Sequence, residues 1–152
     1  MMKTTAFRTG VACLMAVLAV ACDETGEREE LQRQLDRNRA RWEALALTSY
    51  AVHERVSCYC VFGPDEVIVT VNGGEIVSVT EAETGQPVDT ATSRFYYTVD
   101  DLFDMLERAI READSVRVSY DQTFFFPTEI AIDWIEPAID DEISVETRSL
   151  AQ

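Results

Sequence analysis

The apolar positions of the chain repeat with two different periods, which predict two helices and six strands. Residues 31–49 and 98–113 carry apolar side chains every three or four positions, as amphipathic helices do. Six shorter segments alternate apolar and polar residues, which is typical of strands with one buried face. The predicted order is therefore one helix, three strands, a second helix and three strands. The strand segments are 50–60, 66–71, 75–80, 115–120, 128–135 and 142–148.

Turn signals separate these elements by short connections. Gly63-Pro64 ends the first strand, and Asn72-Gly73-Gly74 is a hairpin signal between the second and third. Residues 81–93 are expected to form a loop, and Thr98 with Asp101 forms a capping-box variant at the start of the second helix. Because short connections favour antiparallel pairing, we expect an α+β fold with a single curved antiparallel sheet and two helices on one face.

The first predicted helix carries an apolar stripe and many arginines. Leu31, Leu35, Trp42 and Leu45 form the stripe. The arginines are expected on the solvated face, paired with nearby glutamates, and a docking surface is the alternative. They are Arg28, Arg33, Arg37, Arg39 and Arg41. The preceding residues 22–30 are charged and lack apolar periodicity, so we expect a short tether there, followed by a single domain over residues 31–152.

The N-terminal residues have the features of a signal peptide. Lys3 and Arg8 precede an uncharged, largely apolar stretch, which predicts a signal peptide over residues 1–21. The cleavage region Leu-Ala-Val-Ala-Cys resembles the lipobox of bacterial lipoproteins, so we expect Cys22 to carry acyl chains that anchor the protein to a membrane. An ordinary signal peptide and a soluble secreted protein are the alternative. The expected location is the extracytoplasmic, periplasmic side of the cell envelope, and Asp23 favours the inner membrane.

The charge of the chain excludes several classes of partner. All 28 acidic residues follow Cys22, whereas Lys3 and Arg8 precede it and leave 11 of the 13 basic residues, a formal charge of −17 for the mature chain. Such a surface repels nucleic acid and anionic lipid headgroups. We therefore expect membrane contact through the lipid on Cys22 alone, an unknown envelope protein as partner, and no cofactor.

Two cysteines remain once the signal peptide is removed and Cys22 is lipidated. Cys58 and Cys60 lie on the same face of a strand, about 6.6 Å apart between Cα atoms in ideal geometry. This separation is near the upper limit for a disulfide, so bridging requires a bend. A strained disulfide is the leading interpretation in an oxidising compartment. Two separate core thiols and a metal site are the alternatives, although His53, the only histidine, lies on the opposite face.

Two further groups of residues form a possible binding surface. The carboxylates could gather into a calcium site or an acid–base pair, or could simply occupy turns and the surface. They are Asp121, Asp133, Asp140, Asp141 and Glu142. The adjacent rings Phe124, Phe125 and Phe126 lie in a predicted loop where at most one or two can point inward. An exposed remainder would suggest a protein or lipid contact, and full burial is the alternative.

The order and spacing of several motifs carry a family resemblance. They are Trp42, Tyr50, Cys58-Tyr59-Cys60, the helix opening TVDDLF, Tyr120-Asp121, Pro127 and the acidic run Asp140 to Glu142. Together they resemble a family of small bacterial lipoproteins classed as a domain of unknown function, number 6174, over residues 42–145. Phe125 stands where that family usually has a glycine, so the turn is expected to differ in shape. The resemblance implies a membrane-anchored extracytoplasmic module and no reaction.

These observations favour a lipid-anchored binding or envelope-assembly module without catalytic activity. No nucleophile motif is recognised around His53 or the cysteines. One alternative is a thiol-disulfide or metal-dependent envelope enzyme that uses Cys58 and Cys60. Another is an anchored inhibitor of an envelope hydrolase.

Overall fold

The computed structural model describes residues 21–59 and 63–152, with side chains from Gly26 onward. The predicted signal peptide, apart from its last residue, and Cys60 lie outside the described residues, as does the side chain of Cys22. Three helices are described: α1 (Ala21–Ala44), α2 (Thr90–Ser93) and α3 (Val99–Glu112). The short α2 lies in the segment predicted as a loop, where the Asp89 carboxylate accepts hydrogen bonds from the N–H groups of Ala91 and Thr92.

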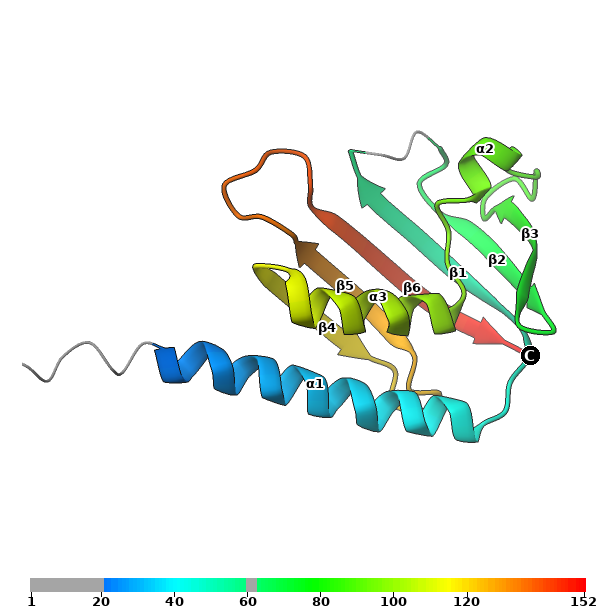
Figure 1. Ribbon diagram of the computed structural model, residues 1–152. Helices are drawn as coiled ribbons and strands as arrows, with labels where there is room; N and C mark the ends of the chain where they lie inside the picture. Colours follow the sequence, from blue (N-terminus) through cyan, green and yellow to red (C-terminus); the bar gives the residue numbers. More distant parts are fainter. Residues whose placement is uncertain (1–20, 60–62) are drawn as a thin grey trace, which may run out of the picture.

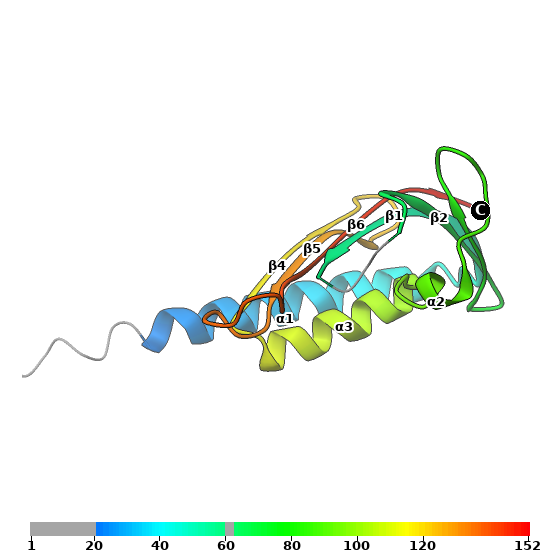
Figure 2. The same cartoon turned by 90° about the horizontal axis from the view of Figure 1, so that it is seen from above.

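Six antiparallel strands form one sheet in the order β3-β2-β1-β6-β5-β4. Each set of three consecutive strands is a meander, and the pairing of β1 with β6 joins the two meanders in the middle. Helices α1 and α3 pack against one face (Figure 1), and the sheet curves over them (Figure 2). The predicted α+β architecture is confirmed. The strands are β1 (Ser49–Cys58), β2 (Val67–Asn72), β3 (Glu75–Glu81), β4 (Ser115–Tyr120), β5 (Pro127–Asp133) and β6 (Ile143–Ala151).

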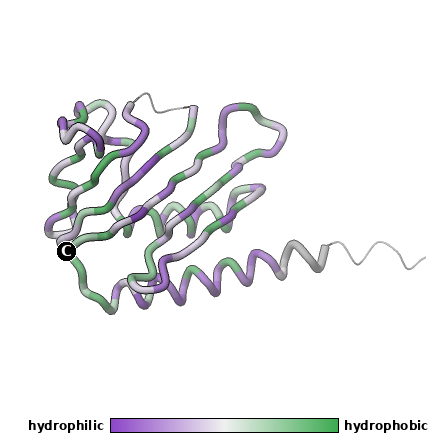
Figure 3. Tube along the Cα trace, turned by 180° about the vertical axis from the view of Figure 1, so that it is seen from behind, coloured by the Kyte–Doolittle hydropathy of each residue, from purple (hydrophilic) through white to green (hydrophobic). Residues whose placement is uncertain are grey.

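The core lies between α3 and the sheet. The predicted stripe of α3 is buried in full, and Leu102 and Ala109 join it. Thr98 caps the helix: its hydroxyl accepts from Asp101 N–H, while the Asp101 carboxylate accepts from Thr98 N–H, so the capping box is complete. Strand residues alternate between this core and solvent, which the hydropathy along the chain reflects (Figure 3). The stripe comprises Val99, Phe103, Leu106, Ile110 and Ala113.

Helix α1 begins and ends earlier than the sequence predicts. The helix is already formed at Ala21, where the described residues begin, so the segment predicted as a tether is helical, and it ends at Ala44 rather than near Ser49. Arg28 connects this part of the helix to α3, because its guanidinium donates to Ile110 O over 2.7 Å and to Ala113 O over 2.6 Å at the end of α3. These two bonds hold the first turns of α1 against the domain. No helix in the described part of the chain is long and apolar enough to cross a membrane.

The arginines of α1 divide between two roles. Arg33 and Arg37 pair with glutamates of the same helix, as expected for a solvated face. Arg39 instead reaches α3, where it pairs with Asp104 and donates to Glu107 over 2.8 Å. Together with Arg28, it shows that part of the arginine face joins the two helices, which corrects the expectation that all five are solvated.

Candidate functional site

The connection between β5 and β6, residues 134–142, crosses the end of the sheet where β1 ends and β6 begins. Cys58 is paired with Ile143 across these two strands. Two hollows of about 380 Å³ and 200 Å³ lie at this corner. The smaller one also contacts α3 through Met105 and Arg108. The residues that line both hollows are Cys58, Tyr59, Asp140, Glu142 and Ile143.

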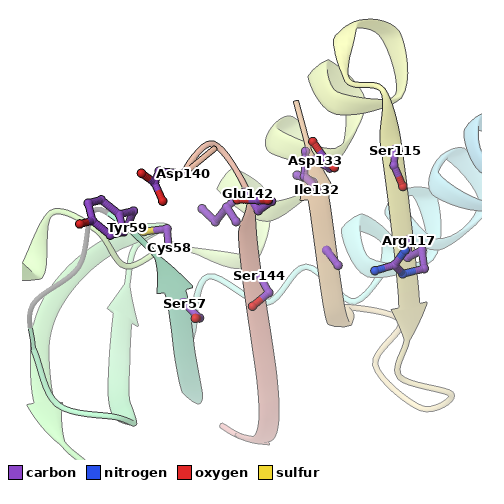
Figure 4. Close-up of a pocket in the computed structure, with 12 residues that line it drawn as sticks. Ser57, Cys58, Tyr59, Ser115, Arg117, Ile132, Asp133, Asp140, Glu142 and Ser144 are labelled. Carbon is purple, nitrogen blue, oxygen red and sulfur yellow. The ribbon is translucent and has the colours of Figure 1, made fainter. Parts of the chain in front are cut away.

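The larger hollow is about equally polar and apolar and spans four strands. Ser57, Ser144 and Arg117 line it from β1, β6 and β4, and Asp133 lies at the end of β5 (Figure 4). Its walls therefore offer hydroxyl groups, one guanidinium and carboxylates. This set of groups can form hydrogen bonds and ion pairs with a bound partner.

Four of the five predicted carboxylates gather at this corner. Asp140 and Glu142 line both hollows, Asp133 lines the larger one and Asp141 the smaller one. Both carboxylate oxygens of Asp141 and one of Asp133 are shielded from solvent and lack a hydrogen-bond donor among the described residues. Burial, followed by the negative charges of Asp141 and Glu142, raises the pKa of Asp133. The corner is thus a concentration of negative charge that lacks donors.

Within the described residues, the carboxylates are not arranged as the calcium site that the sequence left open as one possibility. No group of three or more potential ligands is placed there to hold a metal ion. The gathering itself follows from the fold, because the strand ends of β5 and β6 and the connection between them contribute all four side chains. The acidic corner instead presents its charge toward the two hollows.

Asp121 and the three phenylalanines lie elsewhere, at the other end of β5. Asp121 accepts hydrogen bonds from the N–H groups of Thr123 and Phe124 and stabilises the β4–β5 turn. Phe126 is buried, and Phe124 and Phe125 are partly buried. The predicted binding surface is therefore two separate regions, because the loops before and after β5 lie at opposite ends of that strand.

Phe125 keeps a backbone conformation that suits glycine. Its φ is +65°, in the left-handed region, and the guanidinium of Arg41 lies 5.1 Å from its ring centroid. Phe125 thus has the left-handed conformation that glycine adopts most easily, and the expected difference in turn shape from the family stays a prediction. A non-glycine residue in this conformation carries backbone strain, which the ring contacts offset in part.

Cys58 is disulfide-bonded in the structure, at the end of β1. Its predicted partner, Cys60, lies outside the described residues, so the pairing of Cys58 with Cys60 stays a prediction. The carboxylates of Asp140 and Glu142 line the same hollows as Cys58. Negative charge at this position disfavours a thiolate, which is the reactive form of a cysteine.

The site includes apolar side chains that sequence reasoning missed. Tyr59, Ile135 and Ile139 are 75%, 55% and 87% exposed. Ala138 N–H donates to Ile135 O over 2.7 Å, so a tight turn forms the tip of the connection that carries both isoleucines. The signal available in the sequence was the stretch WIEPAI, in which apolar residues flank a proline within an acidic segment.

A buried glutamate was also missed. Glu54 is 0% exposed on β1, between Val67 of β2 and Thr147 of β6. One carboxyl oxygen accepts from Tyr97 N–H over 3.1 Å, while the other and the Tyr96 hydroxyl have no partner in the described chain. Burial raises the pKa of Glu54 well above its usual value. Period-two alternation places Glu54 on the buried face, so this signal was present in the sequence.

The residues that carry the family resemblance have structural roles. Trp42 packs edge-on against Tyr50 at 5.3 Å between ring centroids, and its indole N–H donates to Asp100 over 3.0 Å. The Tyr50 hydroxyl accepts from Val99 N–H over 2.9 Å at the start of α3. These contacts fix α1, β1 and α3 relative to one another.

Comparison with known proteins adds a family and no activity. No curated protein and no solved structure matches the chain. One family model does match, and it covers residues 34–152, which include β1 to β6, α2, α3 and the C-terminal part of α1. The chain therefore belongs to DUF6174, a family of unknown function.

Proposed function

We propose that the protein is a lipid-anchored, extracytoplasmic module of the bacterial envelope that binds another envelope component and catalyses no reaction. The observation that carries this proposal is the continuity of α1, which begins at Ala21 and runs without a break to Ala44. A lipid on Cys22 would therefore be connected to the domain through the continuous helix α1. Arg28 fixes this part of α1 to the end of α3.

The proposed anchor on Cys22 would lie toward the same end of the molecule as the candidate site. Glu27 and Arg28 of α1 line a hollow of about 510 Å³ together with Asp114 and with Glu136 from the β5–β6 connection. Glu27 follows Cys22 by about 7.5 Å along the helix axis. With Cys22 in the bilayer surface, the β5–β6 connection would face the membrane and whatever protein lies there.

The charge around Cys58 argues against the thiol-disulfide enzyme. A redox-active cysteine is stabilised as its thiolate by nearby positive charge or by a helix N-terminus. Each of the two hollows at Cys58 is lined by one arginine, Arg117 or Arg108, but carboxylates outnumber it: Asp133, Asp140 and Glu142 in the larger hollow, and Asp140, Asp141 and Glu142 in the smaller one. An inhibitor of an envelope hydrolase is the special case in which the bound component is that hydrolase.

The anchor is tested in the native bacterium by fractionation of the envelope. We expect Cys22→Ser to release the protein from the membrane fraction or to leave uncleaved precursor, because the acyl chains are its only strong membrane attachment. Cys13→Ser is the matched control, since it removes a cysteine from the signal peptide and leaves the lipobox intact. Gradient separation of the membranes tests the preference for the inner membrane that Asp23 indicates.

Two outcomes contradict the proposal. One is persistent membrane attachment of correctly cleaved Cys22→Ser protein, which would mean that another feature attaches the protein to the membrane. The other is a purified wild-type protein whose N-terminal peptide has the mass of an unmodified cysteine. Either result leaves the fold unchanged and removes the anchor.

A further inference from the structure

The exposed apolar side chains of the candidate site come from two segments that meet at one corner of the sheet, because Trp134 and Asp140 of the β5–β6 connection line the smaller hollow together with Tyr59. Among the described residues, five large apolar side chains are exposed, and three of them, Tyr59, Ile135 and Ile139, belong to the corner where β1 ends and the β5–β6 connection passes. We call these three residues the loop patch. Single exposed apolar residues are common, but grouped ones at the tips of adjacent loops mark interaction sites.

The charge around the loop patch selects the kind of partner. Asp133, Glu136, Asp140, Asp141 and Glu142 flank it. The carboxylate of Asp141 is shielded and lacks a donor within the described residues. Two arginines lie nearby, and they do not neutralise this charge in full. The guanidinium of Arg108 lies 4.7 Å from the ring centroid of Trp134, and Arg117 lines the larger hollow.

The same charge distinguishes between a protein and the bilayer as the occupant. Glu136 lies near Glu27 of α1, close to the start of the helix that would carry the lipid. A loop that inserted here into anionic headgroups would bring several carboxylates with it, and these repel such headgroups. Lysine or arginine side chains of a protein would instead supply the donors that the acidic corner lacks.

We propose, resting on the proposed function above, that the loop patch docks a segment of an envelope protein that carries an apolar side chain beside lysine or arginine. The apolar side chain packs against Ile135, Ile139 and Tyr59. The basic side chains pair with Asp140, Glu142 and their neighbours. Docking takes place at the bilayer surface, where the anchor holds the domain.

The test uses the full-length lipidated protein in its own envelope. A photoreactive benzoylphenylalanine replaces Ile139, and the matched control carries it at Val77, which is 59% exposed on the edge strand β3. We expect one protein adduct from position 139 and none from position 77. Mass spectrometry should place the cross-link on a peptide that contains lysine or arginine.

Charge reversal separates docking from chance capture. Asp140→Lys with Glu142→Lys should lower the yield of the adduct at least tenfold, and Ile135→Ser should lower it in the same direction. The thermal unfolding midpoint of each variant shows that the domain is folded, and Ile135→Ser supplies the answer if the charge reversal unfolds it. High salt should also lower the yield, because exposed ion pairs are screened.

Three outcomes overturn the docking proposal. They are an adduct with lipid alone, which assigns the loop patch to the bilayer; the same protein adduct from position 77; and an adduct that charge reversal and Ile135→Ser leave unchanged. Absence of any adduct from a protein that remains in the membrane fraction also overturns it, while the anchor stands. Recovery of wild-type protein in the soluble fraction refutes the proposed function instead.

Discussion

The Glu54 carboxyl accepts a hydrogen bond from the backbone N–H of Tyr97 over 3.1 Å, inside the core between β1 and the start of α3. The second carboxyl oxygen has no partner in the described part of the protein. Because burial disfavours the charged form, the pKa of Glu54 is raised well above its usual value. A neutral carboxyl thus occupies a position that would otherwise be apolar.

This burial makes stability fall as pH rises. The unfolded chain loses the Glu54 proton near its ordinary pKa of 4.5, whereas the folded chain keeps it to higher pH. The contribution of Glu54 to the free energy of unfolding is therefore fully present below pH 4.5. Between pH 4.5 and the pKa of Glu54 in the folded chain, this contribution declines by at most about 1.4 kcal/mol per pH unit. Glu54→Gln keeps an oxygen that can accept from Tyr97 N–H and should remove this decline.

Denaturant unfolding between pH 5 and 8 measures the effect as the difference between wild type and Glu54→Gln. The variant should gain on the wild type as pH rises. Glu66→Gln is the control: hydrogen bonds from Arg148 lower the pKa of Glu66, so its contribution is lost only as pH falls below the ordinary value of 4.5, and the difference between this variant and the wild type should stay constant from pH 5 to 8. Parallel curves for wild type and Glu54→Gln would show that Glu54 ionises alike in both states.

Leu106 tests the packing of α3 against the sheet. The side chain is fully buried in the middle of the helix, so Leu106→Ala should cost about 2 to 5 kcal/mol in the free energy of unfolding. Ile139→Ala, at a position that is 87% exposed, should change it by less than about 0.5 kcal/mol. A loss of that small size for Leu106→Ala would mean that the helix buries a different face.

Arg28 tests whether the first part of α1 belongs to the domain. Arg28→Ala removes two charge-assisted hydrogen bonds to the last carbonyls of α3 and should cost about 1 to 3 kcal/mol. Arg33→Ala is the matched control on the same helix, because Arg33 makes only exposed pairs with Glu29 and Glu30. Hydrogen exchange over residues 26–34 should become faster in Arg28→Ala alone. Equal exchange in both variants would support the tether that the sequence predicted for residues 22–30.

The elements of the fold could be predicted from local patterns. Alternation and helical spacing depend on neighbours within a few residues, and the glycines at 73 and 74 have the positive φ angles that the predicted hairpin requires. The start of α1 could not be predicted in this way. Its first turns have no apolar stripe, and they are held by contacts between residues more than 80 positions apart.

The candidate site was less accessible to sequence reasoning than the fold. The gathering of Asp140, Asp141 and Glu142 with Asp133 required only that β5 and β6 be neighbours, and short connections predicted that. The separation of Asp121 from this group followed from its position at the opposite end of β5. The loop patch could not be predicted in the same way. Tyr59 follows β1, whereas Ile135 and Ile139 precede β6, and only the pairing of β1 with β6 brings these segments to one corner. Because the two strands are far apart in the sequence, no local pattern predicts this pairing.

The last prediction concerns the disulfide of Cys58. If its partner is Cys60, alkylation of native, non-reduced protein should leave both residues unmodified, and the intact mass should be lower than that of the dithiol form by two hydrogens. Because the enclosed loop is very short, chain entropy contributes less than about 2 kcal/mol. Cys58→Ser with Cys60→Ser should therefore lower stability only modestly and leave the protein in the membrane fraction, since the proposed anchor is on Cys22.

The single variant Cys60→Ser is the control for the pairing. It should make Cys58 react readily with an alkylating reagent, because the proposed cleavage removes Cys13 and the proposed lipid occupies Cys22, which leaves no other cysteine to protect Cys58. Ready alkylation of both thiols in freshly isolated wild-type protein would contradict the disulfide. Protection that is lost only after a chelator is added would instead assign the two cysteines to a metal ion, with thiolate sulfurs as its ligands.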